Sequence, residues 1–272
     1  MSAFTDLTGK TAFITGGASG IGRGIAEHFL EEGMNVVIGD IEEDVLAATV
    51  KELGCKGIKT DVTKPEDLVA AAEYTVAEYG AVHIVVNNAG VGSMGRIKDL
   101  SLADWRWMLE VNLFGVINGV HTFLPLLSQN PEGGHIVNTS SMAGLTSFAN
   151  LGSYTTSKFG VVGLTEALAR ELEEDGSRVG ATVLCPGPVR SNIKAGLRSR
   201  PAEETSGLFD VDASVEGPLA SMRWMPAIEC GRLVGRAIKN GDLYAITHPE
   251  LWPLVEDRQA GVQAAFAGQP VR

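Results

Sequence analysis

Residues 11–25 read TAFITGGASGIGRGI, and this stretch decides the fold of the chain. A run of apolar and β-branched residues over 11–15 predicts a buried strand. Four glycines follow within seven positions, and apolar residues then recur at helical spacing. The stretch therefore predicts a strand, a glycine turn and a helix in direct succession.

The glycine turn has the spacing of a phosphate-binding loop. Gly16, Gly20 and Gly22 permit a tight turn, and their missing side chains let backbone approach a pyrophosphate at the amino end of the helix. A glycine turn without a ligand is the alternative. Asp40 ends the next expected strand, where a carboxylate accepts hydrogen bonds from both ribose hydroxyls of NAD and repels the 2′-phosphate of NADP.

Other residues near this turn bear on the cofactor. Asp40 could instead cap the following helix, but neither Ser19 nor Ile41 is basic, so NAD is preferred over NADP. Asp61 and Val62 could contact the adenine, and the alternative is an acidic turn. Asparagines at 87–88 close the fourth expected strand, where the carboxyl edge of a parallel sheet opens into a ligand crevice.

The same alternation of strand and helix continues along the chain. Further strands are expected over 34–39, 55–60, 82–86, 135–138, 179–184 and 243–247. Strands without polar alternation, separated by helices of 10 to 25 residues, require a parallel sheet covered on both faces. The prediction is an α/β fold, a Rossmann-type doubly wound parallel sheet of about seven strands, in one domain over 1–272. Only residues 190–225 depart from this alternation of strands and helices, and we interpret them as a candidate substrate lid.

The charge balance excludes several classes of function. In 272 residues, 22 Lys and Arg against 33 Asp and Glu give a net charge of −11, which argues against binding nucleic acid or anionic lipid. The three cysteines and five histidines lack metal-ligand spacing, so no metal site is expected. Residues 1–10 do not resemble a signal peptide, and the charge-free stretch 111–131 contains Asn, His and Pro. We therefore expect a buried helix over 111–131 and a cytoplasmic protein.

A second group of polar residues points to catalysis. Tyr154 and Lys158 stand four apart at the start of an expected helix, so both lie on its apolar, inward face. An adjacent ammonium lowers the pKa of a phenol from about 10, which suits it to proton transfer. Ser140 or Ser141 offers a hydroxyl to a substrate carbonyl, and Asn112 lies in the charge-free region before them. Taken singly, each of these residues could serve structure alone.

Together these motifs resemble the short-chain dehydrogenase/reductase superfamily in its single-domain form. The resemblance covers nearly the whole chain, from residue 9 to about residue 249. The motifs that carry it are TGGASGIG at 15–22, Asp40, DV at 61–62, NNAG at 87–90, Asn112, SS at 140–141, YTTSK at 154–158 and PGPVRS at 186–191.

The resemblance implies a role for each of these residues. Tyr154 would be the general acid/base, and Lys158 would bind the nicotinamide ribose and lower the pKa of the tyrosine. Ser141, 13 residues before the tyrosine as in the family, would orient the reacting oxygen. Asn112 would hold a water that links Lys158 to solvent. Cofactor contacts are implied for Gly16, Ser19, Gly20, Ile21, Gly22, Asp40, Asp61, Val62, Asn88, Gly90, Tyr154, Lys158, Pro186, Val189 and Ser191. Substrate contacts are implied for Ser141, Met142, Tyr154 and Gly187.

The expected reaction is hydride transfer between a secondary alcohol or ketone and NAD. A bulky, apolar or aromatic substrate fits the apolar residues near the lid, whose alternative role is ordinary packing. They are Met94, Met142, Leu145, Phe148, Pro188, Leu208, Phe209 and Trp224. The stretches at 117–125 and 134–141 resemble bacterial aryl-alcohol and lignin-dimer dehydrogenases. The family resemblance also implies a homodimer or homotetramer, formed through helices near 102–128 and 153–173.

Other functions compete with this interpretation. An NADPH-dependent ketone reductase is disfavoured by Asp40, and a non-catalytic NAD-binding regulatory protein by the complete catalytic set. A sugar-nucleotide epimerase is disfavoured because no enlarged substrate domain follows the sixth expected strand.

Overall fold

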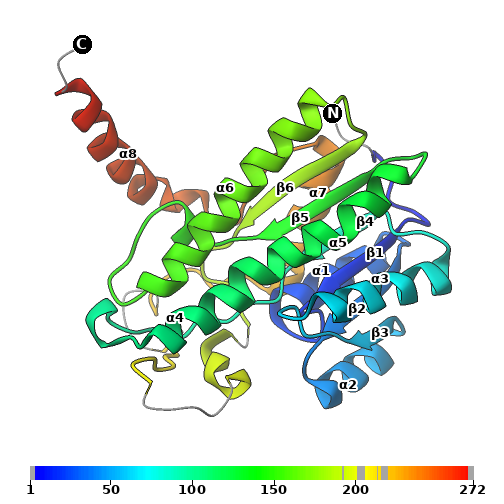
Figure 1. Ribbon diagram of the computed structural model, residues 1–272, viewed down its shortest axis with the longest axis horizontal. Helices are drawn as coiled ribbons and strands as arrows, with labels where there is room; N and C mark the ends of the chain where they lie inside the picture. The colour runs from blue at the N-terminus through cyan, green and yellow to red at the C-terminus, as the bar shows by residue number, and fades with distance from the viewer. Residues whose placement is uncertain (1–3, 192, 201–205, 213, 216–219, 269–272) are drawn as a thin grey trace.

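Seven parallel strands form one central sheet in the order β3-β2-β1-β4-β5-β6-β7 (Figure 1). The computed structural model describes residues 4–191, 193–200, 206–212, 214–215 and 220–268. The strands are β1 (Thr11–Thr15), β2 (Asn35–Asp40), β3 (Lys56–Lys59), β4 (Ile84–Asn87), β5 (Gly134–Thr139), β6 (Val179–Cys185) and β7 (Tyr244–Ile246). The predicted doubly wound parallel α/β sheet is confirmed, and each strand lies within two residues of its expected bounds.

Helices cover both faces of the sheet (Figure 1). They are α1 (Gly20–Glu31), α2 (Glu43–Leu53), α3 (Pro65–Tyr79), α4 (Leu102–Leu109), α5 (Gly115–Gln129), α6 (Gly152–Glu174), α7 (Ala227–Asn240) and α8 (Trp252–Ala267). In β1, Ala12 and Ile14 pack in the core shared with α1 and α7. Phe13 faces the other way and stacks on Phe123 of α5, with ring centroids 5.1 Å apart. Because both faces are buried, the three central residues of the strand are apolar in succession, and the threonines at its two ends are buried as well.

The charge-free stretch expected to be one helix contains an irregular turn. A five-residue π-helix at Glu110–Phe114 joins α4 to α5. The combined stretch Leu102–Gln129 has the length and composition of a membrane span, alone among the described residues. One face of α5, including Val116, Phe123 and Leu127, is buried in the core. The stretch therefore packs one face on the core, as part of two helices joined by a π-turn and not as the single buried helix that the sequence predicted.

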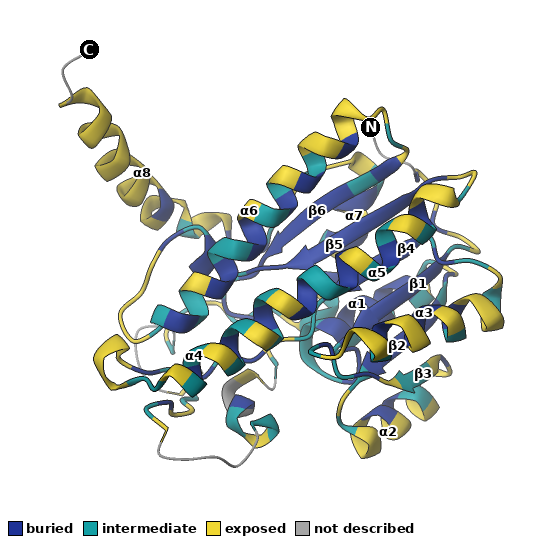
Figure 2. Cartoon of the chain, in the orientation of Figure 1, coloured by how far each residue is buried: buried dark blue, intermediate teal, exposed yellow. Residues whose placement is uncertain are grey.

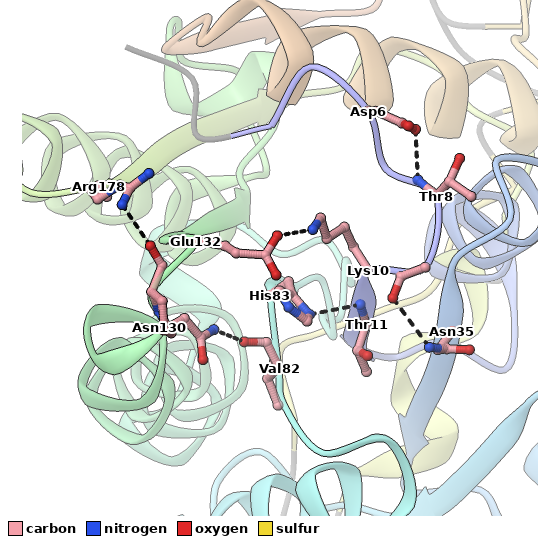
Figure 3. A network of polar contacts seen from close by, with 12 residues as sticks. Asp6, Thr8, Lys10, Thr11, Asn35, Val82, His83, Asn130, Glu132 and Arg178 are labelled. Atoms are coloured by element: carbon pink, nitrogen blue, oxygen red, sulfur yellow. Dashed lines mark hydrogen bonds and ion pairs between the residues drawn. The ribbon is translucent and has the colours of Figure 1, made fainter.

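The amino-terminal edge of the sheet is closed by a polar network (Figure 3). The backbone amide of Thr11 donates to His83 Nδ1 at 3.0 Å, and Lys10 forms an ion pair with Glu132. Arg178 donates to the carbonyl of Pro131 at 2.7 Å. These bonds tie strand beginnings to the loops beside them, so they stabilise the edge opposite the glycine turn.

Helix α8 was not expected from the sequence and projects away from the sheet (Figure 1). Its residues are almost all exposed, with only Val255 buried, as Figure 2 shows. The guanidinium carbon of Arg258 lies 4.8 Å from the ring centroid of Phe159 in α6. The apolar residues of α8 do not share one face, so helical periodicity gave no signal for it.

Candidate active site

The candidate site lies at the carboxyl edge of the sheet, where the ends of β1 and β4 are bonded together. Thr15 Oγ1 accepts hydrogen bonds from the amides of Asn88 at 2.9 Å and Ala89 at 3.0 Å. The amide nitrogen of the Asn88 side chain donates to the carbonyls of Thr15 at 3.0 Å and Gly16 at 3.2 Å. Asn88 therefore holds the glycine turn in place.

The glycine turn packs so closely on its neighbours that side chains at Gly16 and Gly22 would collide with other protein atoms. Gly16 has a φ of +62°, and a Cβ there would lie 2.8 Å from the Cα of Ala89. A Cβ on Gly22 would lie 2.2 Å from the carbonyl oxygen of Gly16. Ser19 is the N-cap of α1, yet its side chain makes no cap hydrogen bond, and the first turn of α1 contains no acidic residue. These features fit a phosphate group at the positive end of the helix.

Asp40 lies against this turn at the end of β2. Its Oδ2 accepts from the amide of Ala18 at 3.1 Å, and its Oδ1 accepts from the amide of Glu42 at 3.2 Å. Burial raises the pKa of Asp40, and the two amide hydrogen bonds oppose that rise. The N-cap of α2 is Glu42, so Asp40 does not have the alternative role of helix cap.

Asp61 and Val62 both have structural partners. Asp61 Oδ1 accepts from the amide of Thr63 at 3.1 Å and from its hydroxyl at 2.7 Å, which is the acidic turn weighed as the alternative. Val62 is buried, and its carbonyl accepts from Asn118 at 3.0 Å. An adenine contact by either residue stays a prediction.

The first turns of α6 bring the catalytic candidates together. The Lys158 ammonium lies 5.6 Å from the ring centroid of Tyr154 and donates to the carbonyl of Thr139 at 3.0 Å. The Tyr154 side chain hydrogen-bonds Ser141. Ser140, in contrast, donates to the carbonyl of Lys158 at 2.8 Å. Ser141 also accepts from the amide of Ala143 at 3.1 Å and donates to the carbonyl of Pro186 at 3.5 Å, so both serines have backbone partners and Ser141 alone also interacts with the phenol.

Asn112 lies in the π-helix and is fully buried. Its side-chain oxygen accepts from the amide of Val91 at 2.8 Å, and its nitrogen donates to the carbonyl of Val91 at 2.9 Å. A Cβ on Gly90 would lie 3.1 Å from Asn112 Oδ1 and 3.5 Å from Lys158 Nζ. Gly90 therefore lies between the glycine-turn end of the site and its catalytic end, and π-helical turns are frequent at functional sites.

The pKa of Tyr154 departs from the expectation. Burial raises it above its ordinary value, and the hydrogen bond with Ser141 lowers it by less. Burial likewise lowers the pKa of Lys158 to about 8. The lowered tyrosine pKa expected from the neighbouring ammonium is therefore wrong for the protein by itself, because burial disfavours the phenolate by more than the hydrogen bond with Ser141 favours it.

Two residues of the site were missed by sequence reasoning. Ser157 is buried, donates to the carbonyl of Tyr154 at 2.6 Å and lies 3.3 Å from the side-chain nitrogen of Asn112. Thr139 supplies the carbonyl that accepts from Lys158. Ser157 could have been predicted from its position next to Lys158 on the inward face of the helix. Thr139 acts through its backbone carbonyl, which any residue type supplies, so the sequence could not identify it.

The predicted residues after β6 lie beside Ser141. The carbonyl of Pro186 accepts from the amide of Met142 at 2.8 Å, and Gly187 donates to the hydroxyl of Thr247 at 2.9 Å. Val189 is buried and pairs with Met225. Ile21 packs on the core, and Ser191 is partly exposed. The predicted lid 190–225 is described except at 192, 201–205, 213 and 216–219.

Some of the expected pocket residues lie near Tyr154. Leu208 is buried in a small cluster with Val91 and Met108, against which Tyr154 packs. Leu145 instead packs on the core beneath α5 and α6. Phe148 and Phe209 are exposed, at 37% and 45%, so they are available to a ligand.

Known proteins share this sequence and fold. The family described as short chain dehydrogenase matches residues 10–202. The chain is 38% identical over 203 residues to 3beta-hydroxysteroid dehydrogenase 2 of Eggerthella lenta, covering 72% of this chain and 77% of that one. It is 34% identical over 255 residues to C alpha-dehydrogenase of Sphingobium sp. strain SYK-6, covering 90% and 83%. A short-chain dehydrogenase/reductase from Burkholderia phymatum in complex with NAD superposes with a TM-score of 0.89 at 36% identity, covering 98% of each chain.

Proposed function

The chain belongs to the short-chain dehydrogenase/reductase family, and from that premise we propose that it interconverts a bulky, largely apolar secondary alcohol and its ketone with NAD. The observation that carries the proposal is the grouping of Tyr154, Ser141, Lys158 and Asn112 beside the glycine turn. A regulatory protein that only bound the cofactor would not need a buried lysine beside a tyrosine and a serine hydroxyl.

In this proposal each residue of the site has one task. Ser141 holds the oxygen of the substrate, and Tyr154 removes its hydroxyl proton in the oxidative direction. Lys158 stabilises the tyrosinate and binds the nicotinamide ribose, and Asn112 holds the proton path to solvent. NAD, when bound, supplies the acceptor for the hydride of the carbinol carbon. Gly16, Gly20 and Gly22 would hold its pyrophosphate, and Asp40 its adenosine ribose.

The substrate class rests on the surroundings of Tyr154 and on the relatives. Leu208, Val91 and Met108 make one wall apolar. The name of one relative, a 3beta-hydroxysteroid dehydrogenase, indicates a ring-bearing alcohol substrate for that protein. We therefore favour aromatic and alicyclic secondary alcohols over phosphorylated ones. We also propose that the chain acts as a single catalytic domain, in a cytoplasmic homodimer or homotetramer.

The direct test is a panel of aryl and alicyclic secondary alcohols offered with NAD or NADP, with formation of the reduced cofactor followed by absorbance. We expect turnover with NAD, and kcat/KM at least about tenfold lower with NADP because the Asp40 carboxylate repels a 2′-phosphate. Equal or higher kcat/KM with NADP would support the ketone-reductase alternative. Binding of NAD without turnover across the panel would support the regulatory one.

Replacing Asp40 by asparagine removes its charge and the hydrogen bond from the amide of Glu42. The amide oxygen can still accept from the Ala18 backbone, so the glycine turn keeps its partner. We expect the preference for NAD over NADP, measured as a ratio of kcat/KM values, to fall about tenfold or more. Glu43→Gln removes an equal charge from the exposed start of α2 and should leave the ratio unchanged. An unaltered ratio in Asp40→Asn would show that another residue selects the cofactor.

A further inference from the structure

The carboxylate of Asp104 has more partners than a helix cap requires. Asp104 is fully buried in the first turn of α4 and shares a capping box with Ser101. Its oxygens also accept from the hydroxyl of Ser206 at 2.8 Å and the amide of Gly207 at 3.1 Å. The Arg200 guanidinium forms an ion pair with it at 2.7 Å. One side chain therefore joins α4 to a segment about a hundred positions further along the chain.

This arrangement is costly for a cap alone. An exposed aspartate caps a helix equally well, whereas burying a carboxylate and a guanidinium carries a desolvation cost that their attraction offsets only with good geometry. The Arg200 side chain is 10% exposed, and its guanidinium carbon lies 6.0 Å from the ring centroid of Trp107. The hydrogen bonds hold the pKa of Asp104 below its ordinary value, although burial acts to raise it.

The segment that Asp104 holds shares an apolar cluster with Tyr154. We call its described residues, 193–200 and 206–212, the strap. Leu208 of the strap is buried beside Val91 and Met108, and Leu197 and Tyr154 pack against this cluster. Leu197 and Leu208 therefore place apolar surface on the cluster that contains the general acid/base candidate.

Two other contacts hold the strap closely against the rest of the protein. Asp210 accepts from the hydroxyl of Ser93, just after β4, at 2.7 Å and from the amide of Leu197 at 3.2 Å. Gly207 passes so near the loop before α4 that a Cβ on it would lie 2.0 Å from the carbonyl oxygen of Asp99. A side chain at position 207 would displace the strap without changing any charge.

We propose that Asp104 is a positioning residue for the reaction, which holds the strap over Tyr154 through Arg200, Ser206 and Gly207. This inference rests on the proposed function, because the strap serves a purpose only if Tyr154 transfers a proton. Asp104 itself does not touch the reacting atoms. Its contribution is to keep apolar surface over the site, which excludes water and completes the wall against which the substrate binds.

Limited proteolysis tests the anchor without relying on activity. Trypsin cleaves after Arg198, which lies in the strap and forms an ion pair with Glu42 at 2.5 Å, whereas the bond after Arg200 precedes Pro201 and resists trypsin. In Arg200→Gln and in Gly207→Ala, we expect cleavage at Arg198–Ser199, identified by mass spectrometry, to be about tenfold faster than in the wild type. Ser101→Ala weakens the cap of α4 and leaves every strap contact in place, so its cleavage should match the wild type.

Steady-state kinetics on the same variants test the link to the reaction. We expect Arg200→Gln and Gly207→Ala to raise KM for the alcohol about tenfold while kcat changes less than about threefold, because the chemical groups are intact. Arg200→Lys, which restores a cation, should recover part of the loss. Wild-type cleavage and wild-type KM in both variants, or an equal effect of Ser101→Ala, would overturn the proposal. If no alcohol is turned over, the proposed function fails, while cleavage still decides whether Asp104 anchors the strap.

Discussion

Tyr154→Phe is expected to lower the turnover of secondary alcohols by about 10³-fold, because it removes the hydroxyl that exchanges a proton with the substrate. The phenylalanine ring keeps the contacts of Tyr154 with the cluster of Leu208, Val91 and Met108. NAD binding, measured by calorimetry, should therefore stay within about threefold of the wild type. Turnover within about tenfold of the wild type would refute the assignment of Tyr154 as general acid/base.

The pH dependence of kcat/KM in the wild type and in Tyr154→Phe is a second test of Tyr154 as the general acid/base. Burial raises the pKa of Tyr154 in the protein alone, so the reactive phenolate becomes more abundant as the pH rises. We expect kcat/KM for alcohol oxidation in the wild type to increase with pH, about tenfold per unit below the apparent pKa. Tyr154→Phe should lose this increase. Tyr79→Phe, which removes a hydroxyl from a tyrosine at the end of α3, should retain it.

Lys158→Met is expected to abolish activity and at the same time to stabilise the fold. The Lys158 side chain is buried, it donates to the carbonyl of Thr139, and none of the described carboxylates pairs with it. Burial lowers its pKa from 10.5 to about 8, which means that the protein bears a cost for holding the charge. We expect the variant to lose at least about 10²-fold in turnover and to gain ~2 kcal/mol in the free energy of unfolding at pH 7, measured by urea denaturation.

The gain should disappear at high pH. Between pH 8 and 10.5 the unfolded chain binds a proton at Lys158 that the folded protein has released. The wild type therefore gains stability as the pH rises through this window, and above it the difference from Lys158→Met vanishes. Lys98→Met removes an exposed ammonium and should not change stability at either pH. A variant less stable than the wild type at pH 7, by an amount independent of pH, would contradict a costly buried charge.

The parallel sheet could be predicted because its cause is local. The central strands are covered on both faces, so residues such as Phe13 and Ile14 of β1 are apolar in succession and mark the strand directly. Glycine residues at the turn after β1 and the pair Tyr154–Lys158 are likewise short-range patterns. Helix α8 could not be predicted, since its residues contact little of the protein and carry no periodic face.

Within the site, sequence spacing identified which residues take part, and the tertiary structure decided how they are used. Both Ser140 and Ser141 follow β5 and both donate to backbone carbonyls, and only the packing of α6 against that strand brings Ser141 to the phenol of Tyr154. The ion pair between Arg200 and Asp104 joins two segments that are distant in the sequence. No local sequence pattern connects these two residues, so the pair could not be predicted. The direction of the Tyr154 pKa also depends on burial, which is a property of the assembled fold. Secondary structure depends on residues that are neighbours in the sequence, so it can be predicted from local patterns. Burial from solvent and pairing between distant residues depend on tertiary packing, so they are determined only in the folded protein.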